Sequence, residues 1–130
     1  MRYIMFQKRF APAVSVGEKV QTIRPPRKGK PFLPGEEISL RVWTGAPYRS
    51  PQEEIRRAEV IRVTAIAIDA RFLNLGGLVT LDEGRPLERV DLDAFARRDG
   101  FRSWEELLSW FREAHGLPFW GELIKWRIVE

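Results

Sequence analysis

The sequence predicts one α+β domain over residues 1–130, a small and mostly antiparallel β-barrel with short helices inserted over one end. Three observations lead to this prediction. A chain of 130 residues that is 44% hydrophobic suits one domain with a single core. Strand patterns follow one another over residues 2–68 without long helices between them, which disfavours a parallel α/β sheet. The clear helical patterns come late, just before a last strand pattern.

The first third of the chain predicts strands separated by one short helix and one loop. Hydrophobic spacing and the helix stop at Gly17 indicate a strand over residues 2–6, a short helix over 7–17 and a strand over 20–24. Residues 25–35 form a proline-rich loop. The next strand covers 36–43, where apolar residues alternate with polar ones.

Turn residues over 44–51 separate this strand from a long β-branched stretch. That stretch, residues 55–68, predicts a strand with Ile61, Val63 and Ala65 on one face. Residues 72–87 predict a further strand, or two strands broken at Gly76–Gly77.

Two helices are expected before the last strand. Asp91 or Asp93 can cap a helix over 94–98, which Gly100 ends. Residues 103–116 carry the clearest helical pattern, with a capping box at its start and Gly116 and then Pro118 at its end. Its apolar stripe consists of Trp104, Leu107, Leu108 and Phe111. The closing strand, 120–129, places Ile124, Trp126 and Ile128 on one face.

Composition narrows the function classes. No apolar run approaches the about 20 residues of a membrane helix, so no membrane partner is expected. The chain has no cysteine and one histidine, which leaves no thiol nucleophile and no histidine-based metal cluster. We therefore expect a cytoplasmic protein without a metal or another cofactor. The net charge is +4, and cations crowd residues 24–30, as suits a phosphate-bearing partner.

Lys19, Thr22 and Arg24 form the first candidate site. On a strand over 20–24, Thr22 and Arg24 project to the same face, and Lys19 could reach that face from the preceding turn. A lysine with a lowered pKa can act as the base for a threonine nucleophile, and a neighbouring arginine would lower that pKa or hold an anion. The alternative is structural, with a strand threonine and solvated cations.

Further candidates lie elsewhere in the chain. Asp99 either pairs with Arg97 or Arg98 at a helix end, or faces Lys19 as a site carboxylate. His115 is expected to interact favourably with a helix C-terminus. Trp43 and Tyr48 either stack on bases or pack against loops. The remaining tryptophans at core-compatible spacing are expected to pack, namely Trp104, Trp110 and Trp126.

Several of these segments together resemble the ASCH domain family, a β-barrel group related to PUA domains. They are "MFQKRFAPAVSVGEKVQTIR", "PGEEISLRVWTG", "ARRDGFRSWEELLSWF" and "FWGELIKWRI". The resemblance implies a partner that is RNA or a modified pyrimidine nucleoside. Similar small bacterial members hydrolyse N4-acetylcytidine with a lysine, a threonine and a glutamate, which implies Lys19 as base and Thr22 as nucleophile. Asp99 takes the glutamate's place, to position or protonate the leaving amine.

The resemblance also leaves other functions open. Other members of the family are reported as metal-dependent ribonucleases, and others are interaction modules with no known reaction. In each case the residues expected to bind ligand are Arg24, Arg27, Lys28, Lys30, Trp43 and Tyr48. Arg24 would recognise the ligand, and the outer cations of the 25–35 loop would attract phosphates.

Overall fold

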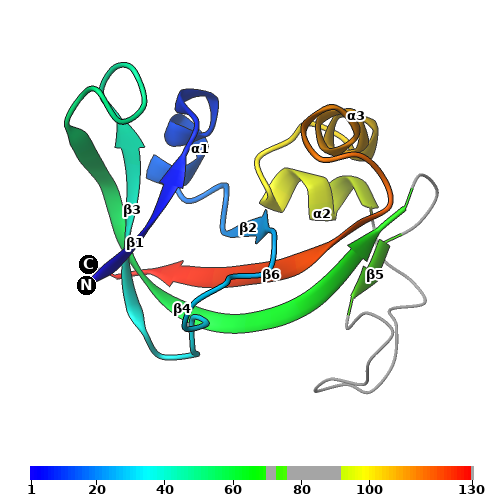
Figure 1. Cartoon of the computed structure of the whole chain (residues 1–130), viewed down its shortest axis with the longest axis horizontal. Helices are drawn as coiled ribbons and strands as arrows, with labels where there is room; N and C mark the ends of the chain where they lie inside the picture. The colour runs from blue at the N-terminus through cyan, green and yellow to red at the C-terminus, as the bar shows by residue number, and fades with distance from the viewer. Residues whose placement is uncertain (70–72, 76–91, 130) are drawn as a thin grey trace.

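A computed structural model describes residues 1–69, 73–75 and 92–129 and shows an α+β fold built on one sheet (Figure 1). Within these residues, five strands of the sheet lie in the order β1–β3–β4–β6–β2, and a sixth strand, β5, pairs with β4 outside this order. β1 pairs with β3 in parallel, and the other pairings are antiparallel. The prediction of a mostly antiparallel sheet is therefore confirmed.

The elements lie close to where the sequence predicts them. The strands are β1 (Arg2–Phe6), β2 (Gln21–Arg24), β3 (Glu37–Trp43), β4 (Gln52–Ile68), β5 (Leu73–Leu75) and β6 (Phe119–Ile128). The helices are a 3-10 turn η1 (Lys8–Phe10), α1 (Ala11–Ser15), α2 (Leu92–Arg98) and α3 (Trp104–Ala114). The predicted break at Gly76–Gly77 lies outside the described residues, as does Asp91.

The long strands β4 and β6 form a curved floor, and α1, α2 and α3 all lie on its concave side (Figure 1). β1 and β2 are the two edge strands of this order, and among the described residues no strand pairing joins them. The two edges nevertheless approach each other, because Arg24 of β2 donates from Nη2 to the carbonyl oxygen of Met5 in β1 at 2.6 Å. Closure of the sheet into a barrel stays a prediction.

The core fills the space between the curved sheet and the helices. The predicted stripe of α3 is buried, and Ser103 caps this helix by accepting a hydrogen bond from the Glu106 N–H at 3.2 Å. Glu106 does not return that bond to Ser103 but accepts from the Arg102 N–H at 3.0 Å. Trp104 and Trp126 are buried as predicted. The apolar stripe and the cap therefore place α3 as the sequence indicates.

Two sequence predictions need correction. The sequence predicts Ile61 on one face with Val63 and Ala65, but Ile61 is 51% exposed. The register of β4 against β6 shifts between Val60 and Arg62, and this bulge turns Ile61 outward. Asp93 lies inside α2 rather than capping it, and its Oδ1 accepts from the Trp104 N–H of α3 at 2.8 Å.

Candidate functional site

The gap between the two edge strands of the sheet holds a pocket of about 170 Å³. β1 contributes Met5 and Phe6, and β2 contributes Thr22, Ile23 and Arg24. Lys19 precedes β2 and Pro25 follows it. The remaining lining residues come from the segment after β1, from the α2–α3 connection and from the end of α3: Gln7, Phe10, Asp99, Phe101, Trp110, Phe111 and His115. The structure thus brings Lys19, Thr22, Arg24 and Asp99 to one cavity.

Lys19 and Asp99 form a buried pair at this pocket. Lys19 Nζ donates to the backbone carbonyl of Asp99 and lies 3.6 Å from its Oδ2. Lys19 is 2% exposed and Asp99 is 3% exposed. Asp99 is held there because the turn after α2 is tied to the start of β2, where the Val20 N–H donates to the Arg98 carbonyl at 3.0 Å. The structure therefore pairs Asp99 with Lys19, as the second of the two interpretations expects.

Burial shifts the pKa of both members of this pair towards neutrality. Removal from water lowers the pKa of Lys19 to about 8, against the opposing effect of Asp99, and the nearby charge of Arg24 lowers it further. Removal from water likewise raises the pKa of Asp99 to about 6, although Lys19 opposes this shift. A proton can therefore leave Lys19 at mildly alkaline pH, which a general base requires.

Thr22 and Arg24 project together from β2, as alternation along a strand dictates. Arg24 Nε donates to Thr22 Oγ1 at 3.1 Å, so the hydroxyl oxygen accepts from a cation. This bond leaves the hydroxyl proton of Thr22 free to be donated to another group. A guanidinium in this position would also stabilise negative charge that develops on the oxygen.

The structure adds pocket residues that sequence reasoning did not select. Trp110 packs against the core, as the sequence predicts, and His115 stands at the C-terminus of α3, and both also line the pocket. Phe10 and Phe101 complete an aromatic wall, with ring centroids 5.3 Å apart. The signal for Trp110 is its place on α3 beside the buried stripe rather than on it. His115 carries no such signal, because its position depends on how α3 packs.

Gln21 is another residue that sequence reasoning did not select. It is fully buried, and its Nε2 donates to Asp99 Oδ1 at 3.5 Å. The Oε1 atom of Gln21 has no hydrogen-bond partner within the part of the chain that the structure describes. Gln21 therefore orients the Asp99 carboxylate from the side of β2 opposite Thr22.

The outer predicted ligand residues lie around the pocket rather than in it. Trp43 lines a wider cavity of about 690 Å³, which shares Met5, Phe6 and Gln7 with the central pocket. Tyr48 is 89% exposed, and its ring packs against that of Trp43 with centroids 5.1 Å apart and planes tilted by 49°. The two aromatic rings therefore stand beside the wider cavity, and their contact with a base stays a prediction.

Among the loop cations, Arg27 lines a third cavity, whereas Lys28 and Lys30 line neither that cavity nor the central pocket. Within residues 1–69, 73–75 and 92–129, no group of three or more histidine or carboxylate side chains is placed to hold a metal ion. No helix of these ranges is both long enough and apolar enough to cross a membrane.

Comparisons with protein-family models, with curated proteins and with solved structures gave no match to this chain. Membership of the ASCH family and the roles of Lys19, Thr22 and Asp99 therefore stay predictions that rest on the motifs and on the pocket.

Gly100 packs closely against the pocket residues Phe10 and Lys19, and replacing it with alanine should destabilise the fold. Its φ of +94° is left-handed, and a Cβ would lie 2.9 Å from Phe10 Cδ1 and 3.0 Å from Lys19 Cδ. Gly17 is the matched control, because its φ is +80° but nothing lies within 4 Å of an added Cβ. We expect Gly17→Ala to lower the free energy of unfolding by about 1 kcal/mol and Gly100→Ala by about 2–4 kcal/mol, measured by urea denaturation. Equal losses would contradict the close packing at Gly100.

Proposed function

We propose that this chain is an ASCH-domain protein that binds a modified pyrimidine nucleoside, alone or within RNA, and hydrolyses its N4-acyl amide. The observation that carries the proposal is the buried Lys19–Asp99 pair, which shares one small pocket with the Thr22 hydroxyl. A buried ionisable pair with pKa values moved towards neutrality, in a concave site, is typical of catalytic centres.

The arrangement of the sheet supports the relation to PUA-like barrels. Helices cover the concave side, and the gap between β1 and β2 is the place where such a barrel would close (Figure 1). Arg24 already spans this gap through the Met5 carbonyl. In the proposed protein, the incomplete closure of the barrel makes room for the ligand.

The size and walls of the pocket suit one aromatic ring. A volume of about 170 Å³ is below the about 300–1,000 Å³ of sites that enclose whole drug-sized ligands. A base with its acyl group fits this scale better than an entire nucleotide, so the sugar would point outward. Phe10, Phe101 and Trp110 offer faces and edges on which a base can stack.

The proposed reaction uses Thr22 as the nucleophile and Lys19 as the base. Thr22 Oγ attacks the carbonyl carbon of the acyl group while its proton passes to neutral Lys19 Nζ. The bond between the acyl carbon and N4 then breaks, and N4 takes the proton from Lys19. Cytidine departs, and the acyl group remains on Thr22 as an ester. Water then attacks the ester carbon and gives a proton to Lys19. The bond from the acyl carbon to Thr22 Oγ breaks, Thr22 takes that proton back from Lys19, and the carboxylic acid is released. Arg24 stabilises the oxygen of Thr22, and Asp99 positions Lys19.

Hydrolysis of N4-acetylcytidine tests the proposal, and its pH dependence tests the roles. We expect the purified protein to release cytidine and acetate, with a kcat that rises with pH and is half-maximal at about pH 8, because Lys19 must be neutral to act as base and burial lowers its pKa to about 8. Chromatography of the nucleosides over pH 5 to 9 measures both quantities. A rate that falls above about pH 6 would instead make protonated Asp99 the acid that the reaction needs.

Two other outcomes would replace the proposal. Binding of N4-acetylcytidine without turnover at any pH would leave an interaction module. Cleavage of the RNA backbone in the presence of a divalent metal, with no loss of the acetyl group, would indicate a ribonuclease.

A further inference from the structure

A third cavity, of about 270 Å³, adjoins the central pocket on the side of the proline-rich loop. The two cavities share Met5, Arg24 and Pro25 as walls, so Arg24 stands between them. The far side of the third cavity is formed by Arg27 and Phe32 of the loop. Two guanidinium groups therefore border a hollow directly beside the proposed base pocket.

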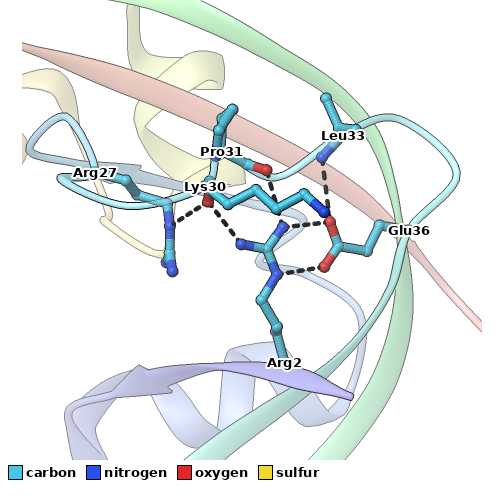
Figure 2. Close-up of polar contacts among 6 residues, drawn as sticks. All are labelled: Arg2, Arg27, Lys30, Pro31, Leu33 and Glu36. Atoms are coloured by element: carbon cyan, nitrogen blue, oxygen red, sulfur yellow. Dashed lines mark hydrogen bonds and ion pairs between the residues drawn. The ribbon is translucent and has the colours of Figure 1, made fainter.

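Arg27 is held in place by contacts that leave most of its donors free. Its Nε donates to the Lys30 carbonyl at 3.1 Å (Figure 2). Its Cζ lies 4.4 Å from the centroid of the Phe32 ring. Its backbone N–H donates to Glu122 Oε1 at 3.0 Å. Neither Nη of Arg27 has a hydrogen-bond or ion-pair partner in the described ranges. A fixed guanidinium with free donors loses little freedom on binding an anion.

Arg2 of β1 shows what a purely structural arginine looks like beside the same loop. Its Cζ also lies 4.4 Å from the Phe32 centroid. Glu36, however, neutralises it through hydrogen bonds of 2.6 and 2.5 Å (Figure 2). Arg2 also donates to the carbonyls of Lys30 and Pro31 at 2.6 and 2.9 Å. Arg2 thus anchors the loop against β1, and Glu36 supplies its counter-charge. Among the described residues, no carboxylate forms an ion pair with the guanidinium of Arg27, and the nearby Glu122 accepts from the Arg27 backbone N–H instead.

Arg24 likewise has no ion-pair partner among the described residues, and it is less exposed than Arg27. The groups to which it donates, the Thr22 hydroxyl and the Met5 carbonyl, carry no charge. No carboxylate of the described chain lies within ion-pair distance of Arg24, and removal from water lowers its pKa. The charge of Asp99 in the central pocket opposes this shift, but Asp99 is paired with Lys19. A half-buried cation without an ion pair of its own is costly, and an anion that binds beside it recovers part of this cost.

We propose that the cavity between Arg24 and Arg27 binds a phosphate group attached to the nucleoside whose base occupies the central pocket. This inference rests on the proposed function and narrows its substrate class from nucleosides to phosphorylated nucleosides. The phosphate is either the terminal group of a mononucleotide or a phosphodiester of an RNA strand. Within the loop, Arg27 binds the phosphate, whereas Lys28 and Lys30, which do not line this cavity, attract it only at long range.

Calorimetric titration of four ligands tests this subsite. The ligands are N4-acetylcytidine, its 5′-monophosphate, its 3′-monophosphate and a trinucleotide with N4-acetylcytidine at the centre. We expect at least one phosphorylated ligand to bind about tenfold tighter than the nucleoside, because charge-assisted hydrogen bonds from two arginines are strong. A monophosphate that gains as much as the trinucleotide would identify a mononucleotide substrate, and a gain confined to the trinucleotide would identify an RNA strand.

Arg27→Gln should lower the ratio of phosphorylated to unphosphorylated affinity about threefold, because Arg24 still borders the phosphate. Arg112→Gln removes an exposed arginine of α3 that lines neither cavity, and it should keep the full ratio. For the trinucleotide, Arg27→Gln should also reduce the salt slope of binding by about one. Equal affinity of all four ligands for the wild-type protein, or an unchanged ratio in Arg27→Gln, would overturn the phosphate site.

Inorganic phosphate separates this inference from the proposed function. ³¹P line broadening that the wild-type protein causes and Arg27→Gln removes would support the anion site even if N4-acetylcytidine were not bound. Binding and hydrolysis of N4-acetylcytidine without any gain from a phosphate would leave the proposed function intact and remove the anion site.

Discussion

Replacing Thr22 with valine is expected to lower kcat for N4-acetylcytidine hydrolysis by about 10⁴-fold or more, because the variant lacks the nucleophile. Valine has nearly the shape of threonine, and Thr22 is 5% exposed in the interior of β2, so the fold should be retained. Arg24 would lose the hydroxyl as an acceptor but keep the Met5 carbonyl. Chromatography of quenched reactions would measure the rate of both proteins. Mass spectrometry of the wild-type protein would detect the acyl ester on Thr22.

Thr64→Val provides the matched control for this variant. Thr64 lies in β4 and lines neither the central pocket nor the cavity beside it, so the same chemical change should leave kcat within about twofold of the wild type. Substantial turnover by Thr22→Val, with the acyl group transferred directly to water, would show that Thr22 is not the nucleophile. Loss of activity in both variants would point to a defect of the sheet.

The buried Lys19–Asp99 pair should show strong coupling in a double-mutant cycle. Lys19→Met leaves a buried carboxylate without its partner, and Asp99→Asn leaves a buried ammonium, so each should lower the free energy of unfolding by about 3 kcal/mol at pH 7. The double variant should be at least as stable as the wild type, because the introduced methionine side chain would pack, without a charge, against the nearby rings of Phe6 and Phe10. Urea denaturation of the four proteins measures the cycle.

The pH dependence of this cycle follows from the two pKa shifts. The pKa of Lys19 is about 8 in the folded protein against 10.5 ordinarily, so the unfolded chain binds more protons between these values and stability rises with pH there. The pKa of Asp99 is about 6 against 3.8, so the folded chain binds more protons between these values and stability falls as pH rises. The advantage of the double variant over the wild type should therefore be largest between pH 6 and 8.

An exposed ion pair serves as the control for the cycle. Arg127 Nη2 lies 2.5 Å from Glu59 Oε1, and their side chains are 63% and 32% exposed. The corresponding cycle, with Arg127→Met and Glu59→Gln, should give a coupling below about 1 kcal/mol. Additive losses in the Lys19 and Asp99 variants would contradict a coupled buried pair.

Local sequence patterns were enough to predict most of the helices and strands, including β2, which carries Thr22 and Arg24. Alternating apolar residues placed β3, the Ser103 cap and its apolar stripe placed α3, and the spacing of Thr22 and Arg24 put them on one face of β2. These features depend on neighbours a few residues apart in the chain, so their periodicity and capping are visible in the sequence. The bulge at Ile61 was not visible, because it depends on the register against β6.

The surroundings of β2 depend on the tertiary arrangement of the chain. β1 and β2 are close in sequence but stand at opposite ends of the strand order, and this order opens the gap that forms the pocket. Asp99 reaches Lys19 because the turn after α2 is bonded to the start of β2. Arg27 contacts Phe32 and the Lys30 carbonyl and lines the third cavity, whereas Lys28 does not line it. Each of these outcomes depends on packing between segments far apart in the chain, which local patterns do not encode.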